Sequence, residues 1–461
     1  MADKKMHTIG SSTLSIIPLE NFSSTTHLTE NKSTEKQQNY DPFCERDVEH
    51  PNSDAGALAH LLKSSLGSGI LAMPNAMRNA GSVLGMVLTL IIGFICTHCV
   101  HILVKSSHEL CRRTKTPSMT FAETAEMAFK SGPPQVQKLS NFTRKFVNIA
   151  LIATYYSALC VYIVFIATSV KQVIDFHFPE HELNIRLYIL MVMPFLYGLG
   201  LIRNLKYLVP FSAMANIFIF VGFCITLYYM FTGEQATSQV RLITHDITTI
   251  PAFLSTVIFA MEGIGVVMPL ENSMRNPSHF LGCPGVLNIG MTCVVLLYAV
   301  IGLFGYLKYG DDIQASISLN LPTEEILAQV VKLLIAAAIL FSYGLQFFIP
   351  SDITWPMIEP HVRENWRNAA QNSFRIATIT ATVAVALAVP NLGPIISLVG
   401  AVCFSTLGLL CPAVIDTATH WERGLGKWRW LLWKNVFIIV FSLIALFTGA
   451  YSAILEIIEE M

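Results

Sequence analysis

The stretch His60-Leu-Leu-Lys63-Ser-Ser-Leu-Gly67-Ser68-Gly69-Ile-Leu-Ala-Met-Pro74 decides the fold. It is apolar enough to cross a membrane, but it carries a Gly-Ser-Gly break at its centre and two ionisable residues just before it. A spanning helix must satisfy its own backbone hydrogen bonds, so a break at mid-depth is tolerated only where the freed groups are buried in protein or face a wet cavity. The break therefore indicates a site. Free amides from Gly67 to Ile70 would begin a new half-helix and direct its positive dipole end at an anionic group such as a carboxylate.

The composition is that of a polytopic membrane protein. Of the 461 residues, 53% are hydrophobic and only 13% are charged, whereas soluble domains carry about 25% charged residues. A net charge of -1 without a basic block excludes a nucleic-acid partner. The ten cysteines fall in predicted spans or on the predicted cytosolic side, so we expect no disulfide framework. The Cys96/Cys99 pair is interpreted as helix packing, and no metal or cofactor is predicted.

Eleven windows are long enough to span, the first at 55–77 and the sixth at 250–270. Lysine and arginine test this count, because they are retained on the cytoplasmic side of short loops. With a cytosolic N-terminus, 23 of the 30 basic residues lie inside and 5 outside. The C-terminus is then external or luminal. Residues 1–54 are polar and are predicted to be a disordered cytosolic tail. Residues 121–129, in a basic loop, are predicted to form a short interfacial helix.

The sixth window repeats the pattern of the first. It reads Phe259-Ala-Met-Glu262-Gly-Ile-Gly265-Val-Val-Met-Pro269-Leu-Glu271-Asn272, again with a Gly-x-Gly break, an ionisable neighbour and a proline. The two broken windows are five spans apart, and an odd repeat enters the membrane with opposite polarity. We therefore predict an all-α fold with a first five-helix repeat at 55–232, an external loop at 233–248, a second, inverted five-helix repeat at 249–416, and an eleventh helix at 417–461.

The chemistry of the two breaks is complementary. The first offers free N–H groups at Gly67 to Ile70, and the second offers free C=O groups around Phe259 to Glu262. One end suits a carboxylate and the other an ammonium group. An α-amino acid is the simplest solute that satisfies both, and paired interrupted helices indicate a transporter's binding site.

Several ionisable residues could have either a functional or a structural role. His60 lies on the face of Gly67, and its imidazole titrates near physiological pH, so it is the proton-coupling candidate. Glu262 is predicted to carry protons or to balance Lys63, which could equally snorkel to the interface.

Two further pairs are interpreted as structural. Glu271 and Asp352 are interpreted as solvated boundary residues near the cytosolic ends of spans, and the tyrosine pair Tyr155/Tyr156 as packing.

Several runs together resemble the animal proton-assisted amino acid transporters, most of all an insect member. They are Tyr40-Asp-Pro-Phe, Arg46-Asp-Val-Glu-His50-Pro, His60-Leu-Leu-Lys63, Gly67-Ser-Gly-Ile-Leu-Ala-Met-Pro74, Asn79-Ala-Gly81 and the sixth-window run from Phe259 to Asn272. The resemblance covers the chain from about Tyr40 to its end.

It implies an eleven-helix carrier of the amino acid/auxin permease group, with the inverted-repeat leucine-transporter fold, for small neutral amino acids such as glycine, alanine and proline. It implies proton coupling at His60. The substrate contacts that it implies are Ser65, Gly67, Ser68, Gly69, Ile70, Phe259, Ala260, Glu262, Gly263 and Gly265.

One departure concerns the membrane of residence. Surface-located vertebrate members pair two external cysteines, and no cysteine lies in 171–186 or 308–325. The expectation is therefore the plasma membrane, the lysosomal or late endosomal membrane, or both.

We predict a secondary active transporter that moves amino acids and protons toward the cytosol. The alternatives are a facilitative or exchange carrier with a structural His60, and a sensor that recruits a cytosolic growth-signalling complex through its tail. Without a nucleophile–base pair or a metal-ligand cluster, an enzyme is not predicted.

Overall fold

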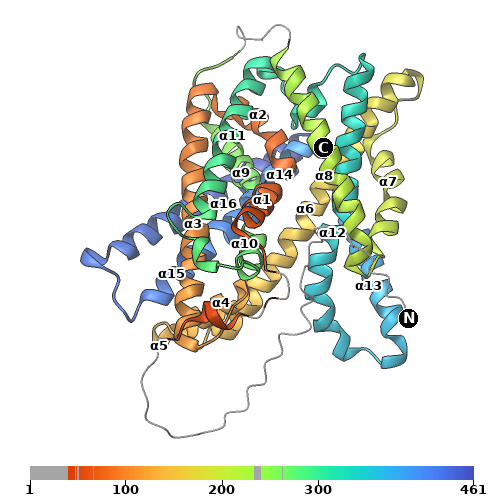
Figure 1. Cartoon of the computed structure of the whole chain (residues 1–461). Helices are drawn as coiled ribbons and strands as arrows, with labels where there is room; N and C mark the ends of the chain where they lie inside the picture. The colour runs from red at the N-terminus through yellow and green to blue at the C-terminus, as the bar shows by residue number, and fades with distance from the viewer. Residues whose placement is uncertain are drawn as a thin grey trace, which may run out of the picture.

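The computed structural model describes residues 40–46, 48, 51–65, 67–232, 240–261 and 263–460. Over these residues the chain is helical, apart from an isolated bridge between Asn52 and Met274 (Figure 1). The α-helices are α1 (Asp54–Ser65), α2 (Ser68–Ala80), α3 (Ser82–Thr114), α4 (Phe121–Lys130), α5 (Pro134–Gln137), α6 (Ser140–His177), α7 (Ile185–Gly200), α8 (Leu205–Phe231), α9 (Ile250–Ala260), α10 (Ile264–Asn272), α11 (Val286–Tyr309), α12 (Ile326–Ile358), α13 (Arg367–Ala388), α14 (Leu392–Val399), α15 (Cys411–His420) and α16 (Trp430–Glu460). A π-helix, η11 (Gly400–Leu410), joins α14 to α15, and the 3-10 helices are η2 (Pro42–Glu45), η3 (Pro179–His181), η5 (Ile247–Thr249), η6 (Pro277–His279), η7 (Gly310–Asp312), η8 (Ile317–Asn320), η9 (Glu359–His361), η10 (Glu364–Trp366) and η12 (Lys427–Arg429).

Eight helical runs within the described residues are long and apolar enough to cross a membrane. They are Ser82–Thr114, Ser140–His177, Lys206–Phe231, Ile247–Asn272, Val286–Asp312, Ile326–His361, Leu392–His420 and Lys427–Glu459. The other predicted spans correspond to the broken pair α1–α2, to α7, which is apolar but shorter, and to α13, which begins with polar residues. The polytopic helical fold is confirmed, while the count of eleven and the inverted repeat stay predictions.

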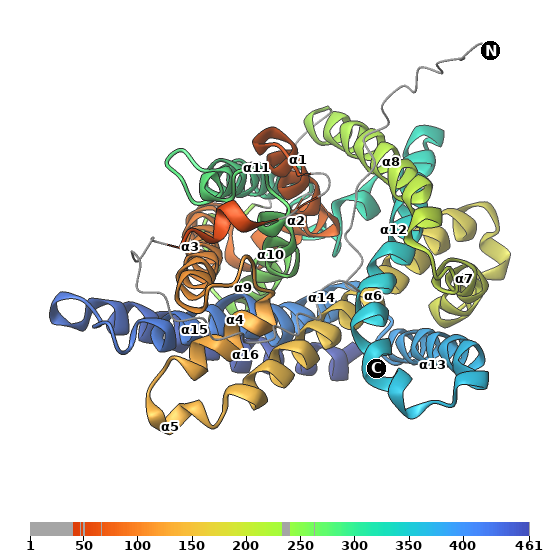
Figure 2. The same cartoon turned by 60° about the horizontal axis from the view of Figure 1, so that its bottom comes forward.

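The two broken helix pairs occupy the middle of the molecule. In Figures 1 and 2, α1, α2, α9 and α10 lie between α3 and α11 on one side and α6, α8 and α12 on the other. The segments α14, η11, α15 and α16 form a blue layer that crosses the lower half of Figure 2. This arrangement surrounds both breaks with helices, so their free backbone groups are shielded from lipid.

Helix α9 packs closely against η11 and α16 at Ser255. A Cβ atom placed on Gly400 of η11 would lie 2.0 Å from the Ser255 carbonyl oxygen, and one on Gly449 of α16 would lie 2.1 Å from its hydroxyl oxygen. Both approaches are closer than a side chain allows, so only glycine fits at either position. Helix α9 is therefore packed directly on the backbones of η11 and α16.

We call the end of the molecule that holds residues 105–145 the basic end, because eight lysines and arginines lie in this segment. Helix α4, at this end, confirms the short helix predicted at 121–129. A capping box explains its start: the Thr120 hydroxyl accepts from the Glu123 amide, and the Glu123 carboxylate accepts from the Thr120 amide.

Part of the predicted tail is folded onto the basic end. Residues 42–45 form η2, which Asp41 caps by accepting from the Phe43 amide at 3.1 Å. Residues 1–39 of the predicted tail lie outside the described residues. The ten cysteines all lie in the described residues, and none of them forms a disulfide bond.

Candidate functional site

The structure confirms the first break. Helix α1 ends at Ser65, and α2 begins at Ser68 after Gly67, whose extended backbone (φ -97°, ψ -151°) interrupts the helix. No side chain caps the start of α2. The first amides of α2 are thus left without intrahelical acceptors, as predicted for Gly67 to Ile70.

The second break is also confirmed. Helix α9 ends at Ala260 and α10 begins at Ile264, with Gly263 at the N-cap and no side-chain cap. At the end of α9, the Met261 amide donates to the carbonyls of Val257 and Phe259. The last turn of α9 therefore presents the negative end of a helix dipole at this point.

The two breaks touch one another. A Cβ atom on Gly69, in the first turn of α2, would lie 2.6 Å from the Ala260 Cα atom in the last turn of α9. Gly263 faces the other side of the first break, where a Cβ would lie 3.7 Å from the Ser65 hydroxyl oxygen. The positive end of α2 thus lies directly beside the negative end of α9, which is the juxtaposition that a small dipolar ion requires.

Two polar groups at the end of α1 complete the first break. The Tyr298 hydroxyl, from α11, donates a hydrogen bond to the Ser65 carbonyl, one of the carbonyls that the end of α1 leaves free. The Ser65 hydroxyl is buried and has no hydrogen-bond partner among the described residues. Ser65 therefore presents an unused polar group at the contact between the breaks, whereas Tyr298 was not recognised from the sequence because it resembles any other tyrosine in an apolar span.

Tyr155 of α6 packs against the second break, in agreement with the packing role that the sequence favoured. Its hydroxyl oxygen would lie 2.7 Å from a Cβ on Gly265 in the first turn of α10. The tyrosine thus packs where only a glycine leaves room for it. The spacing of the Gly263-x-Gly265 pair was visible in the sequence, but nothing in the sequence indicated which helix would approach it.

The other predicted contacts are buried in protein. Ile70, Phe259 and Ala260 are 1–3% exposed. The Phe259 ring packs edge-on against Phe404 of η11, with the ring centroids 5.8 Å apart. Ser68 is partly buried beside Gly67. The Phe259 side chain thus faces η11 and not the breaks. At the end of α9, only the backbone is placed to contact a ligand at the breaks.

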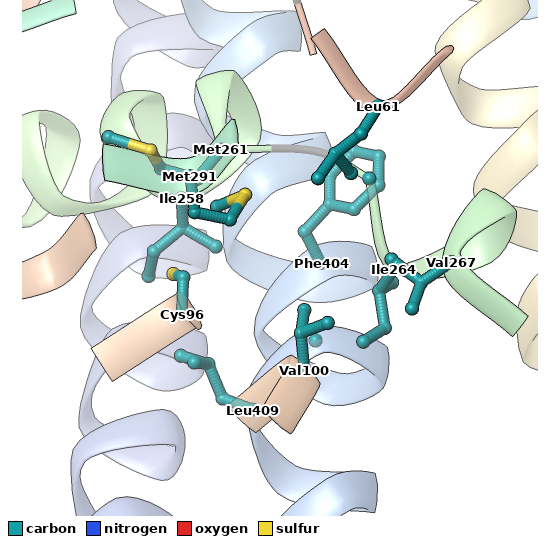
Figure 3. Close-up of a pocket in the computed structure, with 12 residues that line it drawn as sticks. Leu61, Cys96, Val100, Ile258, Met261, Ile264, Val267, Met291, Phe404 and Leu409 are labelled. Carbon is teal, nitrogen blue, oxygen red and sulfur yellow. The ribbon is translucent and has the colours of Figure 1, made fainter. Parts of the chain in front are cut away.

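A small apolar cavity lies behind the second break, between α1, α3, α10, α11 and η11 (Figure 3). Its space for a water-sized sphere is about 20 Å³, enough for one water molecule. It is lined by Leu61, Cys96, Val100, Ile258, Met261, Gly263, Ile264, Val267, Met291, Phe404, Gly408 and Leu409. Its walls are almost entirely apolar side chains, and Met261 and Gly263 of the second break form part of them.

The predicted ionisable residues lie on α1 below the first break. His60 is partly buried and Lys63 is exposed, and neither makes a hydrogen bond or ion pair with another described residue. Glu262 lies outside the described residues, so its predicted pairing with Lys63 stays a prediction. No three histidine, cysteine, aspartate or glutamate side chains come together as metal ligands in the part of the chain that the structure describes.

The interpretation of Glu271 as a solvated boundary residue is wrong. Its side chain is fully buried at the end of α10, within 2.9 Å of Arg46 and 2.7 Å of His108. The sequence separation of 225 residues between Arg46 and Glu271 hid this ion pair. Asp352, the other residue interpreted in this way, is partly exposed.

The chain matches the family described as transmembrane amino acid transporter protein over residues 50–455. It therefore belongs to this family, and the prediction that it is not an enzyme is confirmed. It is 42% identical over 420 residues to the proton-coupled amino acid transporter-like protein pathetic of Drosophila melanogaster, a match that covers 91% of this chain and 88% of that protein. The resemblance to this group of transporters is thereby confirmed.

More distant matches agree with the family and the fold. The chain is 30% identical to vacuolar amino acid transporter 4 of Saccharomyces cerevisiae over 298 residues, which cover 62% of this chain and 38% of that protein. Its fold is similar to that of Mhp1, a nucleobase-cation-symport-1 family transporter, with TM-scores of 0.50 for a closed conformation and 0.52 for an inward-facing one. These matches cover 92% or 94% of this chain and 94% of Mhp1, at 11% and 12% identity.

Proposed function

We propose that this chain is a symporter that couples the movement of protons to the movement of small neutral amino acids, such as glycine, alanine and proline, into the cytosol. The observation that carries the proposal is the direct contact between the first turn of α2, at Gly69, and the last turn of α9, at Ala260. It brings unused N–H and C=O groups together in the protein interior. The name of the Drosophila relative supports proton coupling.

The proposed architecture has eleven spans, in two inverted five-helix repeats followed by the eleventh helix. The matching breaks of α1–α2 and α9–α10, five predicted spans apart, support the repeat. The basic end is proposed to face the cytosol, because its segment 105–145 holds eight of the 23 lysines and arginines that the sequence assigns to the inside, against 5 assigned to the outside.

In this proposal the amides from Gly67 to Ile70 bind the substrate carboxylate, and the carbonyls near Ala260 bind its ammonium group. The Ser65 hydroxyl, which has no partner among the described residues, is placed to add a hydrogen bond to the carboxylate. Burial strengthens each of these charge-assisted bonds. Because the breaks approach within van der Waals contact at Gly69, we expect little space for a long substrate side chain.

The proposed proton carrier is His60, with Glu262 as a second titrating group and Lys63 as a charge partner. His60 lies seven residues before Gly67, about 10 Å along α1 toward the basic end. Its imidazole is not held by another described residue, so a change in its charge can be coupled to movement of α1.

The test is uptake of labelled glycine, alanine, leucine and glutamate into proteoliposomes, with and without an imposed pH gradient. Glycine and alanine should accumulate only when the gradient is present. A His60→Ala variant should lose this accumulation, whereas a His361→Ala variant, which changes an exposed histidine, should keep it. Accumulation that survives in His60→Ala would contradict the proton assignment.

The alternatives give different results in the same assay. A facilitative or exchange carrier would equilibrate glycine at the same rate with and without the gradient. A sensor that works through its tail would keep its transport but lose signalling when residues 1–39 are deleted. The deletion should stop before residue 40, because residues 42–45 and 52 are packed on the basic end.

A further inference from the structure

A buried charge cluster joins the N-terminal segment to α10 and α3 at the basic end. We call residues 40–46, 48 and 51–53 the strap. The Oε1 atom of Glu271 lies 2.9 Å from Nη1 of Arg46, in the strap, and 2.7 Å from Nε2 of His108, in α3. The side chains of Glu271 and Arg46 are 0% and 5% exposed. An ion pair at this depth is far less screened than one at the surface.

Further contacts fix the geometry of Arg46. Its Nε donates to the Pro117 carbonyl at 2.8 Å, and its guanidinium lies 5.3 Å from the centre of the Phe43 ring. That ring also packs edge-on against His108, with the centroids 4.8 Å apart. The guanidinium is therefore oriented by the loop before α4 and by the strap itself, so the cluster is a specific contact and not a chance pairing of surface charges.

A second set of bonds attaches the strap to the segment after α10. The Asn52 amide donates to the Ser273 carbonyl at 2.8 Å, and the Arg275 amide donates to the Asn52 carbonyl at 2.9 Å. Helix α1 begins two residues later, at Asp54. The start of α1 and the end of α10 are thus held together at two points.

These contacts link the two half-helices that run from the breaks to the basic end. Helix α1 runs from the strap to the first break, and α10 runs from the second break to Glu271. In the proposed cycle, a substrate released toward the basic end passes alongside these two half-helices. The strap holds them in contact.

We propose that Arg46 and Glu271 form a latch that holds the basic end closed and opens once in each transport cycle. Both are positioning residues, since neither touches the substrate, and the inference rests on the proposed binding of substrate at the breaks. The cluster suits a reversible contact because it is incompletely satisfied. Among the described residues, Arg46 Nη2 and Glu271 Oε2 are buried without hydrogen-bond partners, which makes the closed contact weaker than a fully bonded cluster.

The variants that test the latch are Arg46→Gln, Glu271→Gln and the double variant. If the latch is broken, a smaller fraction of carriers is open on the side opposite the basic end. The apparent affinity for substrate on that side falls in proportion to this fraction. We expect Arg46→Gln to raise the KM for uptake about tenfold with Vmax kept, which corresponds to a tenfold population shift. The KM of the double variant should be no higher than that of Arg46→Gln, because the two residues act through each other.

A second measurement reports the opening directly. Cys111 of α3 is 0% exposed and lies within electrostatic range of both Arg46 and Glu271. Its alkylation by N-ethylmaleimide, measured by peptide mass spectrometry against the exposed Cys44, should be severalfold faster in Arg46→Gln. The double variant serves if a single variant fails to fold, since it leaves no uncompensated buried charge between the two positions.

The control is the ion pair between His279 of η6 and Asp54 at the start of α1, 2.7 Å apart, which lies near the strap but is 56% and 43% exposed. His279→Gln should leave the KM and Cys111 alkylation unchanged, because exposed pairs contribute little. Unchanged KM and alkylation in Arg46→Gln would overturn the latch. If the unmodified protein moves no amino acid, the proposed function fails, while the alkylation of Cys111 still decides whether Arg46 and Glu271 close the basic end.

Discussion

The two helix breaks have the same Gly-x-Gly spacing but are held in different ways. At the first, Gly69 packs against the backbone of Ala260, and the end of α1 is capped by a hydroxyl from Tyr298. At the second, Gly265 packs against the Tyr155 hydroxyl, which is the far end of a side chain. Backbone cannot move aside locally, whereas a side chain can rotate. The start of α2 is therefore the more rigid, and the start of α10 the more adaptable.

Gly69→Ala should have the largest effect. Its new methyl group would lie against the Ala260 backbone, and overpacking of this kind costs about 1–3 kcal/mol. The gain in helix propensity is only about 1 kcal/mol, so the clash prevails. We expect transport to fall at least about tenfold, measured as initial glycine uptake per reconstituted protein. Wild-type uptake by this variant would contradict the direct contact between the breaks.

Tyr298→Phe should come next, because it removes the hydroxyl that caps the Ser65 carbonyl. A buried carbonyl that loses its partner costs about 1–3 kcal/mol. We expect a lower thermal midpoint in detergent and a reduced rate of uptake. Tyr306→Phe is a suitable control, since that tyrosine lies in the same helix but bonds Asp311 and the Arg241 amide outside the breaks. An equal loss in both variants would show that the cap is not specific to the break.

Gly265→Ala should have a smaller effect that can be reversed. The new methyl group would lie 2.7 Å from the Tyr155 hydroxyl oxygen, which must shift by rotation of its side chain. We expect a severalfold loss of uptake in Gly265→Ala and recovery in Gly265→Ala/Tyr155→Phe, with Tyr155→Phe alone as the reference. If uptake does not recover in the double variant, the glycine at position 265 is not needed to make room for the Tyr155 hydroxyl.

Gly67→Ala should have the smallest effect, although Gly67 lies at the centre of the motif. A Cβ there would meet nothing within 4 Å, and its backbone is extended. Reduced freedom of the unfolded chain contributes about 0.4–1 kcal/mol in favour, and alanine's poorer N-capping offsets it. The thermal midpoint in detergent should stay close to that of the unmodified protein. A large loss of stability in Gly67→Ala would contradict the expectation that a methyl group fits at Gly67 but not at Gly69.

The sequence predicted what depends on local patterning. Apolar windows and glycine spacing located the spans and both breaks, because these depend on residues that are near one another in the chain. It did not predict contacts between distant segments. Glu271 was interpreted as a boundary charge, and neither Arg46 nor Tyr298 was singled out, because only the folded arrangement brings Arg46 to Glu271 and Tyr298 to Ser65.

The tight packing of α9 at Ser255 has a mechanical consequence for the sixth span. With Gly400 against the Ser255 carbonyl and Gly449 against its hydroxyl, the outer part of this span cannot slide relative to its neighbours without separating both contacts. The part after Gly263 has a movable tyrosine on one side and a small void on the other. Any bending of this span is therefore concentrated between α9 and α10, with α9 fixed and α10 as the half that moves.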